Sequence, residues 1–183
     1  LDGCLLCHVG FVIDGEPAVI PTLYWREGDR LYWHGSAQSR MLRAVEGSPV
    51  CIAVTLFDGL VLARSAFNHS ANYRSVIIYG TAIQVTERAE KLLALEAMMD
   101  SIIPERWAQL RPVTDKEVDA TRVMYVAIDE ASAKVREGPP NDRADYAWPV
   151  WAGVIPCSTQ LGAAECDGEL AAPFDRPLAE RPK

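Results

Sequence analysis

The chain has 183 residues, of which 49% are hydrophobic and 23% charged, and its formal net charge is −7. These values are ordinary for one soluble globular domain with a real hydrophobic core. The negative charge excludes broad binding to nucleic acid or anionic membranes, because both need a basic surface. No apolar run approaches the ~20 residues of a membrane span. Two or three arginines can still form a local anion site.

Composition also predicts the domain organisation and the compartment. We expect one domain over residues 1–157, followed by a tail over residues 158–183 with little independent structure, because the tail is rich in Ala, Gly, Glu and Pro. The five cysteines are an odd number, which favours reduced thiols and a cytoplasmic protein.

The first third of the chain predicts a hairpin, a third strand and a short helix. Residues 9–13 and 18–25 are apolar and flank an Asp-Gly turn. Residues 30–34 alternate as a strand does. We then expect Ser36 to cap a helix whose apolar residues at 41–45 share one face.

The rest of the chain predicts more strands and two helices. Residues 50–57 and 60–67 flank Asp58-Gly59, which indicates a second hairpin. The further expected elements are a strand over 75–86 with a bulge or bend at Gly80, a helix from Thr86 to about Ile103, a capping box at 114–117, and strands over 122–128 and 132–137. About six strands, mostly joined by hairpins, predict an antiparallel barrel-like α+β domain.

The segment CLLCH at residues 4–8 matches the C-x-x-C-H pattern of covalent c-type haem attachment. The pattern is short and leads directly into a predicted strand. The alternative interpretation is incidental or core-facing thiols. A zinc half-site is disfavoured, because the chain has no second C-x-x-C pair.

Two polar clusters are candidates for binding an anion. In HGSAQSR (34–40), Ser36, Ser39 and Arg40 could form a phosphate cradle at a helix N-terminus, or Ser36 could be a plain cap. The second cluster, SAFNHSANYRS (65–75), lies between two apolar runs and follows Arg64. It could hold a phosphate or polar ring edges, or it could be a long hydrated loop.

Other catalytic patterns are missing. With three histidines and no H-x-x-x-H or H-x-H spacing, we expect no protein metal site. There is no G-x-S-x-G nucleophile elbow. Trp151, near the end of the predicted domain, could seal the barrel, stack on a planar ligand or cross a dimer interface.

Four segments together resemble a known family. They are TLYWREGDRLYWHGSAQSRMLRAV (22–45), VTLFDGLVLARSAFNHSANYRSVIIYGTA (54–82), DEASAKVREGPP (129–140) and PVWAGVIP (149–156). In this order they resemble the pyridoxamine 5'-phosphate oxidase-like flavin-binding split-barrel proteins, in the branch with the nitroimidazole-resistance (Nim) proteins. The resemblance covers about residues 5–157. The R-L-x-P ending of true pyridoxamine-phosphate oxidases is missing, so pyridoxine chemistry is not expected.

The resemblance implies a six-stranded antiparallel split β-barrel with flanking helices, which forms a homodimer with FMN in two clefts at the interface. By similarity, the residues along the flavin ring are Thr22, Leu23, Tyr24, Val54 and Thr55. The residues near the phosphate are Ser36, Arg40, Arg64, Ser65, Asn72, Tyr73, Arg74 and Ser75. Trp151 would reach the ring from the partner subunit, and His69 stands where Nim-type proteins carry an active-site histidine.

The resulting hypothesis is an FMN-dependent oxidoreductase that passes electrons to a small acceptor such as a nitro-aromatic or quinone-like compound. NAD(P)H is a candidate donor, and His69 and Tyr73 are the candidate catalytic residues. Three alternatives stay open: a flavin-binding or sequestering protein without turnover, a haem-binding protein (through CLLCH or through a related split-barrel haem site), and a deazaflavin in place of FMN.

Overall fold

The computed structural model describes residues 1–165. Within them, nine antiparallel strands form one sheet in the order β6-β7-β3-β2-β1-β4-β5-β8, with β9 paired to β4. The strands are β1 (Leu6–Ile13), β2 (Glu16–Glu27), β3 (Arg30–Ser36), β4 (Pro49–Leu62), β5 (Ser70–Thr81), β6 (Ile83–Gln84), β7 (Thr121–Ala127), β8 (Glu130–Arg136) and β9 (Gly153–Pro156). The helices are α1 (Arg40–Val45), α2 (Arg88–Ile102), α3 (Asp115–Ala120) and the short 3₁₀ turns η1 (Ala66–Asn68), η2 (Trp107–Gln109) and η3 (Arg143–Asp145). The predicted mainly β, antiparallel fold is confirmed, with more strands than six.

The sheet curls into a half-barrel because β2 changes partner along its length. Residues 16–23 pair with β1, and residues 24–27 pair with β3.

The turn between β1 and β2 was predicted correctly: Asp14 and Gly15 have φ angles of 55° and 83°, which suit the tight hairpin turn that Asp-Gly favours.

The predicted hairpin at Asp58-Gly59 is wrong. β4 runs through both residues, and its register against β5 shifts between Phe57 and Gly59, as in a β-bulge. A Cβ at Gly59 would lie 2.6 Å from the carbonyl oxygen of Ile155. The glycine therefore permits the close approach of β9 rather than a turn.

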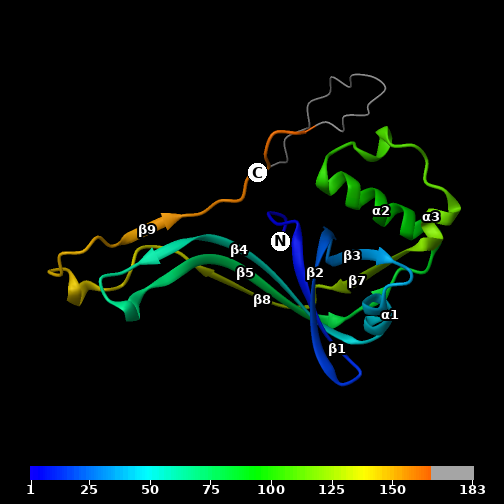
Figure 1. Cartoon of the computed structure of the whole chain (residues 1–183). Coiled ribbons are helices and arrows are strands. Elements are labelled where there is room, and N and C mark those ends of the chain that lie inside the picture. The colour runs from blue at the N-terminus through cyan, green and yellow to red at the C-terminus, as the bar shows by residue number, and fades with distance from the viewer. Residues whose placement is uncertain (166–183) are drawn as a thin grey trace.

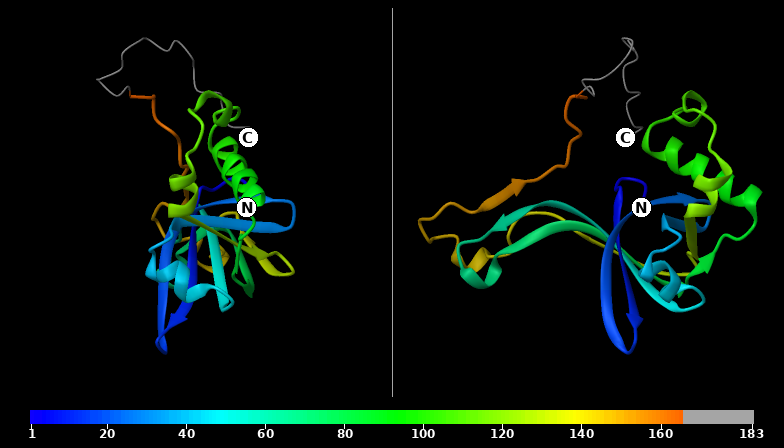
Figure 2. Two further views of the ribbon diagram at one scale, coloured as in Figure 1. Left: turned by 90° about the vertical axis from the view of Figure 1, so that its right-hand side faces the viewer. Right: turned by 45° about the vertical axis from the view of Figure 1, so that its right-hand side comes forward.

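β4 and β5 leave the barrel as a long curved arm (residues 57–74 and 135–156), with β8 and β9 beside them (Figure 1). Its end consists of η1, in the connection between β4 and β5, and the segment around η3. Figure 1 and the right-hand view of Figure 2 show α2 and α3 at the barrel end, away from the tip of the arm. A ligand bound at the tip would therefore be remote from α2.

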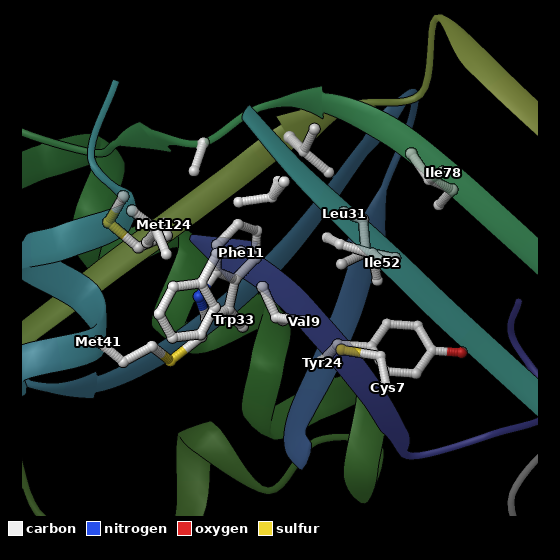
Figure 3. Packing of buried hydrophobic residues seen from close by; sticks show 14 of the residues in the cluster. Cys7, Val9, Phe11, Tyr24, Leu31, Trp33, Met41, Ile52, Ile78 and Met124 are labelled. Atoms are coloured by element: carbon white, nitrogen blue, oxygen red, sulfur yellow. The ribbon is translucent and has the colours of Figure 1, made fainter. Parts of the chain in front are cut away.

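The main core fills the barrel (Figure 3). Trp33, Leu31, Ile52, Ile78 and Met124 lose all or nearly all solvent contact there, and each such side chain contributes about 1.5–3 kcal/mol on burial. The face of α1 predicted from its apolar spacing packs onto this core.

A second, smaller core lies between the sheet and α2. It contains Trp25, Tyr32 and Val123 from the strands and Ala94 and Leu95 from the helix. The helix was predicted from Thr86, but it begins after Glu87, which makes no side-chain cap. No helix in residues 1–165 is long and apolar enough to cross a bilayer.

Two smaller predictions are also decided. The capping box at 114–117 is confirmed at the start of α3. Gly80 keeps its register within β5, so it is not a bulge there; a Cβ would lie 2.3 Å from Val126, so the glycine allows β7 to pass close by. Of the predicted tail, residues 158–165 form no helix or strand and are exposed, and residues 166–183 lie outside the described residues.

Candidate functional site

The tip of the arm holds a hydrogen-bonded cluster built from SAFNHSANYRS. Asn68 Nδ2 donates to Ser65 Oγ at 2.8 Å, and His69 Nδ1 lies 2.9 Å from the carbonyl oxygen of Ser65. Because a carbonyl only accepts, Nδ1 carries the proton in the neutral ring, and Nε2 keeps its lone pair. Nε2 of exposed His69 can therefore accept a proton or ligate a metal ion.

Arg64 is fixed by an aspartate that the sequence did not single out. Asp142 is 2% exposed. One of its carboxylate oxygens accepts from the Arg64 backbone N–H at 2.6 Å, and the other accepts from Nη1 at 3.2 Å. The guanidinium carbon also lies 4.7 Å from the ring centroid of Tyr146. These contacts fasten the segment around η3 to the tip of the arm.

Asn72 is a structural link rather than an open polar group. It is 7% exposed. Its Oδ1 accepts from Arg136 Nη1 at 2.8 Å, and its Nδ2 donates to the carbonyl oxygen of Gly138 at 3.1 Å. Arg136 Nη1 also donates to the carbonyl of Ala71. Asn72 thus ties β5 to β8 and to the chain that follows β8.

Arg74 forms a bidentate pair with Asp58, at 3.0 and 2.8 Å, and this hydrogen-bonded guanidinium lowers the pKa of the Asp58 carboxyl. Both line a hollow of about 350 Å³ on the arm, together with Asn72 and Arg136. Tyr73 precedes Arg74 in β5, and its ring lies under the ammonium group of Lys134 on β8, with 5.6 Å between Nζ and the ring centroid.

The two segments predicted along the flavin ring lie on either side of β1. Thr22 and Leu23 of β2 pair with Cys7 and Leu6, and β4 pairs with β1 next to Val54 and Thr55. Val54 is buried in the core, as is Tyr24, whose hydroxyl donates to the Leu1 carbonyl oxygen. Leu23 and Thr55 are exposed. Ser75 pairs with Thr55 across β4 and β5. The structure therefore brings this part of the predicted site together.

Ser36 and Arg40 lie elsewhere: Ser36 is the last residue of β3 and Arg40 the first of α1, both at the barrel end (Figure 1). The prediction that Ser36 caps the helix is wrong. Ser39 is the N-cap and accepts from the Leu42 N–H, because the helix starts at Arg40, while Ser36 Oγ accepts from the Gln38 N–H. Arg40 pairs at 2.8 Å with Asp14 in the first hairpin turn. A single copy of the chain does not join these residues to the tip of the arm.

Trp151 is 62% exposed and stands two positions before β9 in the chain. A Cβ at Gly153 would lie 2.9 Å from its indole ring, so the ring packs against the glycine backbone.

Asp142 and Arg136 are the contributors that sequence reasoning missed. Arg136 lies in a predicted strand, where the alternation of side chains could have indicated its face. No local signal identifies Asp142.

The C-x-x-C-H segment does not fit covalent haem attachment. Cys7 points into the core with 0% exposure, and burial raises the pKa of its thiol to about 12. His8 is the next residue along β1 and points to the opposite face of the sheet. The described residues contain no group of three or more histidine, cysteine, aspartate or glutamate side chains that could hold a metal ion.

Comparisons with known proteins identify relatives of the whole chain. A family model described as pyridoxamine 5'-phosphate oxidase matches residues 1–135. The structure of the flavocytochrome Anf3 from Azotobacter vinelandii is 47% identical, covers 99% of this chain and 84% of its own, and superposes with a TM-score of 0.92. An FAD- and haem-binding protein from Mycobacterium smegmatis is 41% identical, with coverages of 96% and 87% and a TM-score of 0.90.

A more distant structure shares the fold. It is a proposed 5-nitroimidazole antibiotic resistance protein from Bacteroides thetaiotaomicron, 24% identical, with a TM-score of 0.59 over 72% of this chain and 77% of its own. A search of the curated proteins found no match.

Proposed function

Because the chain belongs to the pyridoxamine 5'-phosphate oxidase family, we propose that it is a redox protein that binds both a flavin and a haem. The observation that carries the proposal is the likeness to two proteins above 40% identity, over nearly the whole chain, one described as a flavocytochrome and the other as binding FAD and haem. The flavin would exchange electrons with a donor or acceptor, and the haem would pass single electrons.

Of the three histidines in this chain, one is the best candidate for a ligand of the haem iron. A ligating imidazole commonly donates its other N–H to a carbonyl or carboxylate, which fixes the tautomer and the ring. His69 makes this contact with Ser65. The Nδ1 atom of His34 is buried without a hydrogen-bond partner among residues 1–165, and burial lowers the pKa of this imidazole. His8 is exposed on β1, and no hydrogen bond within residues 1–165 fixes its ring. We therefore assign the axial ligand to His69.

The surroundings of His69 suit a large apolar ring. Phe67, two residues away, is 95% exposed, and Trp148 and Trp151 on the same arm are also mostly exposed. Exposed aromatic side chains that gather into a patch often mark a ligand or partner site. A porphyrin face would bury such rings, and nearby Arg143 could pair with a propionate.

For the flavin, we favour FAD over the FMN that the family resemblance implies. FMN ends in a phosphate monoester, which needs a compact group of unneutralised cations. The three arginines predicted for it, Arg40, Arg64 and Arg74, are each paired with an aspartate. FAD instead carries one charge on each of two phosphates. The description of the 41% identical relative also names FAD.

We also propose that two copies of the chain complete the site. Leu6, Val19, Leu23 and Tyr79 are exposed on one face of the sheet formed by β2, β1, β4 and β5, as their registers require. A second copy would cover this apolar face and bring its Trp151 and Arg40 toward the arm of the first. In light scattering we expect a dimer that Val19→Asp disrupts, while Leu161→Asp does not.

The reaction that we propose is reduction of a small acceptor, such as a nitro-aromatic or quinone-like compound, with NAD(P)H as the donor. Of the two candidate catalytic residues, His69 is assigned to the iron, so Tyr73 is the remaining candidate proton donor. In the absence of oxygen, NAD(P)H should bleach the bound flavin, and the acceptor should restore its colour. If NAD(P)H does not bleach the flavin, the alternative of a binding protein without turnover is favoured.

The binding proposal has a direct test. The purified protein should show flavin bands and a Soret band, and His69→Ala should shift or remove the Soret band while the flavin remains. His8→Ala removes the other exposed histidine and should leave the Soret band in place. A Soret band unchanged by His69→Ala would contradict the ligand assignment.

A further inference from the structure

We propose that a pocket at the barrel end, between α2 and residues 107–113, binds a small aromatic cation. Its volume is about 670 Å³, within the ~300–1,000 Å³ of small-molecule sites. Leu92, Leu93 and Glu96 of α2 form one wall, and Trp107, Leu110 and Val113 form the other. The surface inside is mostly apolar.

The wall opposite α2 is positioned by polar contacts at both of its ends. At one end, Asp100 Oδ1 accepts from the Trp107 backbone N–H at 3.2 Å. At the other end, Arg111 donates to both carboxylate oxygens of Glu117, and Glu117 in turn closes the capping box with Thr114. These contacts join residues 107–113 to α2 at one end and to α3 at the other.

An open apolar pocket has a free-energy cost that a bound ligand would offset. Leu93 remains 66% exposed, and Leu110 and Val113 are also exposed. The opposite face of α2 already buries Ala94 and Leu95 against the sheet. The helix is therefore apolar on two faces: one is buried against the sheet, and the other is only partly covered by residues 107–113.

The charges around the pocket favour a cation. Glu96 is half-buried and forms no ion pair within residues 1–165. The guanidinium of Arg111, which also lines the pocket, is occupied by Glu117. The remaining polar partner is thus a carboxylate, and the indole of Trp107 can face a cation as well. A planar aromatic ring with an ammonium group matches this combination.

The pocket is separate from the proposed flavin and haem sites. None of the residues predicted for the flavin lines it, and α2 lies at the other end of the molecule from the tip of the arm (Figure 2). Occupation of this pocket and of the redox site can therefore be measured independently.

Two probes of the same shape test the proposal. Benzyltrimethylammonium is cationic, and neopentylbenzene is its neutral counterpart; calorimetry or ligand-observed NMR on the full-length protein would compare them. We expect both to bind, the cation about fivefold more tightly, which is the ratio of a partly exposed ion pair. Equal affinities, or no binding of either probe, would overturn the proposal.

Variants locate the site. Glu96→Gln should abolish the preference for the cation but keep binding of the neutral probe. Ala108→Phe, or Ala89→Phe from the helix side, should fill the pocket and remove both. Glu16→Gln, on β2, is the charge-matched control and should change nothing. If the preference survives Glu96→Gln, or if a folded Phe variant still binds either probe, the assignment is wrong.

Discussion

Asp142→Ala is the substitution for which the structure gives the clearest expected magnitude. It removes the acceptor for the Arg64 backbone N–H and the partner of the guanidinium at once. Breaking a buried ion pair costs roughly 3–5 kcal/mol. The Arg64 side chain is 22% exposed, so water partly replaces the lost partner, and we expect a loss of about 2–3 kcal/mol in the free energy of unfolding. At ~2–4 °C per kcal/mol, Tm should fall by about 5–10 °C.

Urea unfolding followed by circular dichroism measures this loss. Asp142→Asn should cost less than the alanine variant, because the amide oxygen still accepts from the backbone N–H. Asp145→Ala, in the same 3₁₀ turn and without a side-chain ion pair among residues 1–165, is the matched control and should stay within about 0.5 kcal/mol of the wild type. A loss below about 0.5 kcal/mol for Asp142→Ala would refute the view that this carboxylate fastens the end of the arm.

Three further outcomes are expected. Gly80→Ala should destabilise the fold by about 1–3 kcal/mol in the same assay, because the new Cβ would overlap Val126. Cys7 should resist thiol reagents at pH 8 until the protein unfolds, because burial raises the pKa of its thiol to about 12; mass mapping after alkylation checks this. The pKa of Glu117 is lowered to about 2, mainly by its hydrogen bond with Arg111. The contribution of this contact to stability should therefore be complete above pH 4.5 and lost as the pH falls through 2. NMR titration of this carboxyl group checks the shift, and an ordinary midpoint would mean that the contact is absent in solution.

The fold was predictable where the signal is local. Asp14-Gly15 and the capping box at 114–117 both behave as their residue types require. Asp58-Gly59 carries the same turn signal but lies inside a strand. The difference is the approach of β9 from nearly a hundred residues away, and a local pattern does not contain this contact.

The candidate site shows the same limit. The sequence identified Arg40, Arg64 and Arg74 by residue type, and all three lie in ordered polar contacts. Their aspartate partners come from distant or differently folded segments, so neutralisation of these charges was not predictable. Asp142 in particular lies 78 positions from Arg64. The contact between His69 and Ser65, by contrast, spans four residues, and its polar cluster was recognised from composition.

The central claim, that this chain binds a flavin and a haem together, is tested most directly by the absorbance spectrum of the purified protein combined with the mass of the released cofactors. We predict flavin bands and a Soret band at one equivalent each per chain, and a released flavin with the mass of FAD. The mass of FMN would correct the proposed flavin alone. A protein that shows neither chromophore, and takes up neither flavin nor haem on titration, would contradict the account.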